Sequence, residues 1–278
     1  MINKCVCYHS CTDGFTAAFA AYKKFGLTAK YIPCSFGGKV PTFSEYIKTV
    51  YILDFSFPRE TLERWRKSGI RIVLLDHHKT AQDKLSDLSY CKFDMSKSGC
   101  VMAWEYFHPG TDIPVLFQYV QDADLYNWTL PDSQALNMII QSTPKEFLSW
   151  ANLSIDLVLY KKALTRSGER LLDYRSVLMD AVTAKNKILM LPIAGYTVPV
   201  INTPIFISEV GNRLCAEFDT PFAATYFDRS DGMRQWSLRS VGEFDVSRIA
   251  ALFGGGGHKN AAGMETESGR DLKIVEKG

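Results

Sequence analysis

Short apolar runs alternate with amphipathic segments through the N-terminal part of the chain. The apolar runs predict buried strands over residues 5–8, 29–34, 50–53, 70–75 and 90–93. The segments between them carry apolar positions at helical spacing, which predicts helices over residues 13–25, 59–67 and 98–107. Strands that alternate with helices form a parallel sheet with right-handed crossovers. We therefore expect an N-terminal α/β domain built on a parallel sheet.

The pattern changes in the middle of the chain and again near its end. Residues 113–121 and 133–140 have helical spacing, and residues 145–187 are mostly helical without strand patterning. Further on, strand-like segments at 188–201, 223–227 and 235–239 are mixed with helical patterns at 205–218 and 246–253. The turn signal Ser230-Asp231-Gly232 predicts that the segments 223–227 and 235–239 pair as a hairpin. The predicted organisation is an α/β domain over 1–145, a helical connector over 146–187 and a smaller α/β domain over 188–278.

Composition narrows the classes of protein to which the chain can belong. Its 278 residues, 46% of them hydrophobic and 22% charged, are typical of a globular protein and exclude a disordered or coiled-coil chain. The net charge of +2 argues against a protein that covers long nucleic acid, but not against a short phosphate-bearing substrate. No segment resembles a membrane span or a signal peptide, so we expect no membrane partner. Seven scattered cysteines without a Cys-x-x-Cys pair favour a reducing compartment and a cytoplasmic location.

Three of the expected strands are followed by residues that commonly bind metal ions. The first strand is followed by His9 and Asp13, the third by Asp54, and the fourth by Asp76, His77 and His78. The carboxyl ends of parallel strands meet at one edge of the sheet, so these side chains should converge. Asp122, placed in a loop after a predicted helix, adds another carboxylate. An aspartate after a strand commonly caps the next helix, but so many together need a cation to offset their repulsion.

The donor types indicate the kind of ion and the kind of chemistry. Mixed carboxylates and imidazoles suit Mn²⁺, Mg²⁺, iron or zinc. A pair of such ions polarises a phosphoryl oxygen and activates a water molecule, which points to phosphoester hydrolysis but leaves the leaving group open.

A glycine-rich segment near the C-terminus is the second strong signal. Four glycines, Gly254–Gly257, precede His258 and Lys259. Glycines let backbone N–H groups approach an anion closely, and the two following side chains are charge-assisted donors. The sequence therefore favours a shaped, anion-binding loop over the alternative, a flexible loop at a helix end. The predicted substrate-binding residues are Gly255, Gly256, Gly257, His258 and, at the end of a strand, Arg239.

These motifs resemble those of a known family. His9-Ser10-Cys11-Thr12-Asp13-Gly14, Asp54 after an apolar strand, Asp76-His77-His78 and Asp122 resemble the four motifs of the DHH phosphoesterases. The segment 254–263, Gly-Gly-Gly-Gly-His-Lys-Asn-Ala-Ala-Gly, is similar to the signature of the companion DHHA1 domain. The resemblance runs from about residue 4 to residue 263. It implies a parallel-sheet DHH catalytic domain and a smaller α/β DHHA1 domain.

The resemblance also implies roles for individual residues. It implies a two-metal hydrolase that uses Mn²⁺, or Mg²⁺ or another divalent ion, with ligands His9, Asp13, Asp54, His77 and Asp122. Asp54 is similar to the carboxylate that bridges both ions. Asp76 and His78 are expected to orient ligands and contact the scissile phosphate, and His258 with its glycines to bind the far phosphate or terminal nucleotide.

Cys11 departs from the family pattern His-x-Asp-x-Asp-Gly, in which an aspartate stands at its position. Two interpretations stay open. In the first, Cys11 binds an ion as a thiolate, which requires that the thiol be deprotonated. In the second, Cys11 lines the pocket without binding metal, and the first metal site is weak.

The expected activity is exonucleolytic cleavage of short single-stranded oligonucleotides, RNA or DNA, to mononucleotides. The alternatives are a phosphatase acting on 3′-phosphoadenosine 5′-phosphate and a phosphodiesterase acting on cyclic or linear dinucleotides. Because Cys11 replaces an aspartate of the family pattern, a non-catalytic nucleotide-binding module is a further alternative. An inorganic pyrophosphatase or polyphosphatase is disfavoured because relatives of that kind lack the glycine-histidine segment.

Overall fold

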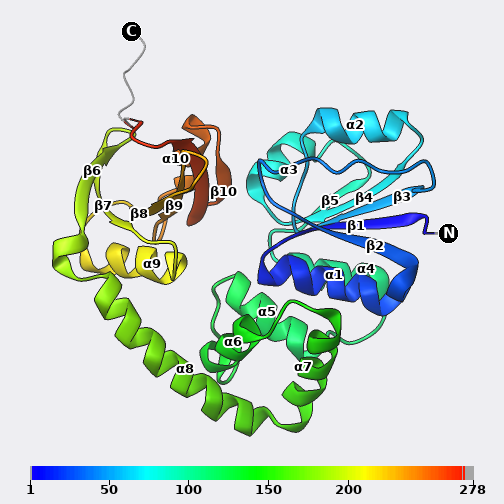
Figure 1. Cartoon of the computed structure of the whole chain (residues 1–278), viewed down its shortest axis with the longest axis horizontal. Coiled ribbons are helices and arrows are strands. Elements are labelled where there is room, and N and C mark those ends of the chain that lie inside the picture. Colours follow the sequence, from blue (N-terminus) through cyan, green and yellow to red (C-terminus); the bar gives the residue numbers. More distant parts are fainter. Residues whose placement is uncertain (1, 271, 273–278) are drawn as a thin grey trace. The chain divides into compact units, whose positions relative to one another are not determined.

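The computed structural model describes residues 2–270 and residue 272 (Figure 1). These residues form two compact units that divide between Asp173 and Tyr174. Each unit has its own sheet, helices and hydrophobic core. The predicted α/β fold class with a parallel sheet in the first part is confirmed.

The first unit is built on a five-stranded parallel sheet in the order β2-β1-β3-β4-β5. Its strands are β1 (Lys4–His9), β2 (Ala29–Cys34), β3 (Thr49–Leu53), β4 (Arg71–Asp76) and β5 (Cys91–Phe93). All of them overlap the segments predicted as strands. The chain order reverses at β1, because β2 and β3 pair with opposite edges of this strand.

Helices cover both faces of this sheet (Figure 1). One face carries α1 (Thr12–Phe25) and α4 (Gly99–Phe107), and the other carries α2 (Arg59–Lys67) and α3 (Lys79–Leu85). Successive strand residues alternate between the two cores: Val6 packs on the α1 side and Cys5 on the α2 side. Burial on both faces explains why the strands read as continuous apolar runs.

Three further helices extend the core on the α1 side. They are α5 (Val115–Asp124), α6 (Ser133–Ser142) and α7 (Phe147–Leu159). Trp150 of α7 is fully buried, and its indole N–H donates to Thr16 Oγ1 of α1 at 3.2 Å. The long helix α8 (Lys161–Val182) passes so close to α6 that a Cβ at Gly168 would lie 2.0 Å from the carbonyl oxygen of Ala135.

The middle of the chain is helical, as predicted. The helix α8 is followed by a short 3₁₀ turn, Lys185–Lys187, which is the second such turn after the one at Gly26–Thr28. The predicted connector, residues 146–187, therefore contains α7, α8 and this second turn. Its limits and those of the flanking domains stay a prediction.

The second unit has a six-stranded mixed sheet in the order β10-β11-β9-β8-β7-β6. Its strands are β6 (Leu189–Ile193), β7 (Tyr196–Asn202), β8 (Ala223–Asp228), β9 (Met233–Arg239), β10 (Gly256–His258) and β11 (Ala261–Glu267). The predicted hairpin is confirmed as the antiparallel pair β8–β9. Helices α9 (Ile207–Glu217) and α10 (Val246–Leu252) contribute to separate cores. Within the described part of the chain, we find no helix with the length and apolar character that crossing a bilayer requires.

Candidate metal centre

The candidate site lies at the carboxyl edge of the parallel sheet. His9 ends β1, Asp54 directly follows β3, and Asp76 ends β4. These three strands are neighbours in the sheet, and β1 is where the strand order reverses. Ligand sites of open α/β sheets form at such a reversal, outside the carboxyl ends of the strands. The convergence expected from the sequence is therefore present for these residues.

Asp54 is the centre of the cluster. Its Oδ1 lies 3.0 Å from His77 Nε2, and its Oδ2 lies 3.6 Å from His9 Nδ1. The same His77 nitrogen lies 3.8 Å from Asp13 Oδ2. Asp54 has a left-handed backbone, with φ of 58°, which aspartate adopts more readily than most residues. Its N–H donates to the carbonyl oxygen of Leu75, so the turn is tied to the end of β4.

Asp13 is fixed by the start of helix α4. Its Oδ2 accepts from the N–H of Gly99 at 2.7 Å, and its Oδ1 accepts from the N–H of Cys100 at 3.0 Å. These are N–H groups of a first helical turn, which favour a negative charge. A Cβ at Gly99 would lie 2.5 Å from Asp54 Cβ, and one at Gly14 would lie 2.2 Å from the His9 carbonyl oxygen. The two glycines therefore allow α1 and α4 to reach the site.

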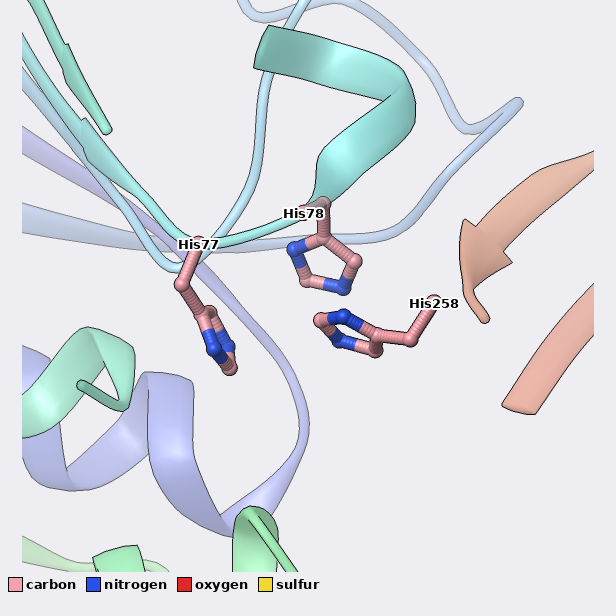
Figure 2. Close-up of side chains that lie close together, drawn as sticks. All are labelled: His77, His78 and His258. Carbon is pink, nitrogen blue, oxygen red and sulfur yellow. The ribbon is translucent and has the colours of Figure 1, made fainter. Parts of the chain in front are cut away.

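Asp76 positions His78. Figure 2 shows the rings of His77 and His78 extending from the segment that joins β4 to α3. The buried Asp76 carboxylate accepts hydrogen bonds from Ser56 Oγ at 2.5 Å and from the backbone N–H groups of His77 and His78. It also accepts from the ring nitrogen Nδ1 of His78 at 2.6 Å. Burial lowers the pKa of His78, but the hydrogen bond to Asp76 and the negative charges of Asp76 and Asp54 together raise it. The contacts of Asp76 orient the His78 ring, and the catalytic role predicted for Asp76 stays a prediction.

Cys11 has two contacts within the cluster. Its thiol donates to Asp54 Oδ2 at 3.0 Å and accepts from the N–H of Gly14 at 3.1 Å, which makes it the N-cap of α1. Burial, together with the charges of nearby carboxylates, raises the pKa of this thiol well above its usual value. These contacts give Cys11 a structural role that does not require the sulfur to bind an ion. Both interpretations of this residue therefore stay open.

The carboxylate that helix α5 places against His77 is that of Asp124, whereas the predicted ligand Asp122 faces the following loop. Helix α5 extends to Asp124 instead of ending near Gln121, and residues two apart in a helix point to nearly opposite sides. Asp124 Oδ2 lies 3.5 Å from His77 Nε2. Asp122 points into the following loop and accepts four hydrogen bonds, from Thr129 N, Thr129 Oγ1, Leu130 N and Ser133 Oγ. Asp122 is therefore a loop-organising residue, and we propose Asp124 as the ligand.

The electrostatics of the cluster fit a cation. Burial and the nearby charges of Asp54 and Asp124 raise the pKa of Asp13 well above its usual value. Partial burial and Asp54 likewise raise the pKa of Asp124 to about 6. Burial lowers the pKa of His77, but its hydrogen bond to Asp54 and the surrounding carboxylates raise it to about 10.

Carboxylates that suppress one another's ionisation mark a place where added positive charge is stabilising. Asp54 belongs to three groups of donors, within this unit, whose ligand atoms lie within 4.8 Å of one another: His9–Cys11–Asp54, Asp13–Asp54–His77 and Asp54–Asp76–His78. The mixture of carboxylate and imidazole donors suits divalent metal ions.

The glycine-rich segment of the second unit forms a strand where a loop was predicted. Residues 256–258 are β10, which ends at His258 and pairs with β11 (Figure 2). A Cβ at Gly255 would lie 2.1 Å from the carbonyl oxygen of Gly263, and one at Gly257 would lie 2.6 Å from that of Ala261. Close packing of β10 on β11 therefore accounts for these two glycines. The substrate-binding role of Gly255, Gly256, Gly257 and His258 stays a proposal.

Arg239, the remaining predicted substrate-binding residue, ends β9. Its guanidinium donates to Ser208 Oγ at 2.7 Å and to the carbonyl oxygen of Leu238 at 2.8 Å. The arginine therefore ties β9 to the first turn of α9, and its role toward substrate also stays a proposal.

Comparisons with known proteins agree with this architecture. Residues 195–276 match the DHHA1 domain family. The chain is 32% identical over 289 residues to protein R106 of Acanthamoeba polyphaga mimivirus, with 93% of this chain and 66% of that protein covered. A solved structure of a DHH domain from a member of a family of ribosomal proteins has the same fold, with a TM-score of 0.56, 15% identity, and coverage of 94% of this chain and 82% of that one. This chain contains a DHHA1 domain.

One relative of this DHHA1-containing protein carries an activity in its name. The chain is 25% identical over 305 residues to oligoribonuclease NrnB of Bacillus subtilis strain 168, with 96% of this chain and 74% of that protein covered. The Asp-His-His sequence of this chain is Asp76-His77-His78, of which Asp76 ends β4.

Proposed function

We propose that the protein is a metal-dependent phosphodiesterase that hydrolyses short single-stranded oligonucleotides to mononucleotides. The observation that carries the proposal is the convergence of Asp13, Asp54 and Asp124 with His9 and His77 at one edge of the sheet. The similarity to a protein named as an oligoribonuclease supports the substrate class. Mn²⁺ is the proposed ion, with Mg²⁺ as the alternative.

The five clustered residues would hold the ions. Asp54 directs one oxygen toward His77 and the other toward His9, so both of its oxygens would be available to hold metal. When bound, such ions polarise a phosphoryl oxygen and lower the pKa of a water molecule. The backbone N–H groups of α4 keep Asp13 oriented during this chemistry.

His78 contributes charge for the substrate phosphate. The Asp76 carboxylate accepts from Nδ1 of His78 and favours the protonated ring. A protonated imidazole pairs with an anionic phosphate through a charge-assisted hydrogen bond. We also keep Gly255, Gly256, Gly257, His258 and Arg239 as proposed substrate-binding residues of the second unit.

The test is a cleavage assay on a ladder of di- to heptanucleotides with Mn²⁺, with 3′-phosphoadenosine 5′-phosphate as a parallel substrate. We expect mononucleotides to accumulate from the short oligonucleotides faster than phosphate is released from the nucleotide. The Asp54→Ala variant should release neither. Absence of cleavage by the wild-type protein, or equal cleavage by the variant, would contradict the proposal.

Replacing Cys11 by aspartate should keep or raise Mn²⁺-dependent activity. An aspartate at this position restores an anionic oxygen next to Asp54 and also caps α1, because aspartate is a strong N-cap residue. The measurement is kcat/KM over a Mn²⁺ titration, with Cys11→Ser as the matched variant that caps the helix without the charge. A collapse of activity in both variants would show that the thiol itself is required.

A further inference from the structure

An exposed phenylalanine lies beside the candidate metal centre. Phe36 belongs to the loop between β2 and β3, and it is 51% exposed. Its ring centroid lies 5.4 Å from that of His9 and 5.5 Å from that of His78. A third ring, that of the buried Phe55, packs edge-on against it at 5.5 Å. Phe36 therefore contacts two histidines from different segments of the site, one at the end of β1 and one at the start of α3.

The other phenylalanine of the same loop behaves differently. Phe43 packs against Trp65, at a ring separation of 4.9 Å, and belongs to the core on the α2 side. Phe36 instead stands in a polar, glycine-containing turn in which the N–H of Gly38 donates to the carbonyl oxygen of Ser35. The turn is anchored to the first motif by the contact of Ser35 Oγ with Ser10 Oγ at 3.2 Å. The turn thus places an apolar ring at the site and leaves half of it accessible to solvent.

The chemistry of the proposed substrate explains such a ring. A nucleobase is joined to its phosphate through a single sugar, so a phosphate bound at His9, Asp54 and His78 brings a base close to Phe36. Bases stack on aromatic side chains whatever their sequence, because every base has a π-face. We propose that Phe36 stacks a nucleobase next to the scissile phosphate, so that the site selects nucleotides over phosphodiesters without a base. This inference rests on the proposed function.

The test compares three substrates in the presence of Mn²⁺. They are a 5′-phosphorylated diadenylate and two analogues, each of which lacks one of the two bases. We expect the wild-type protein to prefer the diadenylate over one of these analogues by about fivefold to 150-fold in kcat/KM, which is the range of base–aromatic stacking. In Phe36→Ala this ratio should fall toward one, whereas Phe36→Trp should retain it.

A matched control comes from the same loop. Tyr46 is 52% exposed, and Tyr46→Ala should show the wild-type ratio. Melting curves of all variants establish that they are folded. Equal hydrolysis of the three substrates by the wild-type protein, or an equal loss on all three in Phe36→Ala, would overturn the stacking proposal and leave the proposed function standing. Hydrolysis of none of them by the wild-type protein would overturn both.

Discussion

Replacing Asp54 by asparagine is expected to abolish metal-dependent hydrolysis, with a fall in kcat/KM of about a thousandfold or more. Asp54 is 2% exposed and contacts His9, Cys11 and His77 through its two oxygens. Its pKa is held well below the usual value, against the effect of burial, by the hydrogen bond from His77 and the close approach of His9, so it is the anionic centre of the site. A metal ion supplies several kcal/mol of transition-state stabilisation, and each 1.36 kcal/mol corresponds to a factor of ten in rate.

Two measurements check this expectation. Bound Mn²⁺, counted by electron paramagnetic resonance, should fall together with kcat/KM, while a melting curve without added metal shows that the variant is folded. Asp87→Asn is the matched control, because Asp87 is an exposed carboxylate of the same unit that pairs with Arg59 on α2. That variant should retain wild-type activity. Full Mn²⁺-dependent activity in Asp54→Asn would remove Asp54 from the centre of the proposed site.

The sheet of the first unit was predictable because both of its faces are buried. Consecutive residues such as Ile52 and Leu53 pack into different cores, so the strands appear in the sequence as unbroken apolar runs. β10 gives no such signal, because its Gly256-Gly257-His258 sequence has no β-favouring side chain. It is a strand because β11 pairs with it, and its glycines fit where a Cβ would collide with the backbone. Such a strand follows from tertiary packing and not from local sequence.

The candidate site was predictable to the same extent as the strands. His9, Asp54 and His77 stand at or just after strand ends, so their convergence follows from the sheet topology. The choice between Asp122 and Asp124 depends on which side of α5 faces the sheet, and a helix end misplaced by three residues hides that information. Phe36 was missed, although a single aromatic residue before two glycines, just after a strand, was a readable signal.

Replacing Asp124 by asparagine should distinguish the role of Asp124 from that of Asp122, the other carboxylate near the end of α5. Asp124 Oδ2 faces His77, and its side chain is 29% exposed, so Asp124→Asn should change the free energy of unfolding by less than about 1 kcal/mol. Its Mn²⁺-dependent kcat/KM should fall by about 100-fold or more, because loss of a partner behind a metal ligand already costs about 10–100-fold and Asp124 is the proposed ligand itself. The result would identify Asp124 as part of the metal-binding set.

Asp122→Asn is the matched variant, two residues away in the same helix, and should lose stability. The Asp122 carboxylate accepts four hydrogen bonds from the loop in which Tyr126 and Trp128 adopt left-handed backbone conformations. Hydrogen bonds to a charged group contribute about 1.5–3 kcal/mol each, and an amide cannot accept all four, so we expect a loss of about 3 kcal/mol in urea unfolding. Mn²⁺ affinity, measured where both variants are folded, should fall more in Asp124→Asn than in Asp122→Asn. A larger fall in Mn²⁺ affinity in Asp122→Asn would assign the ligand role to Asp122 instead. Replacement of a residue that contacts the ion lowers the affinity of the folded protein for Mn²⁺.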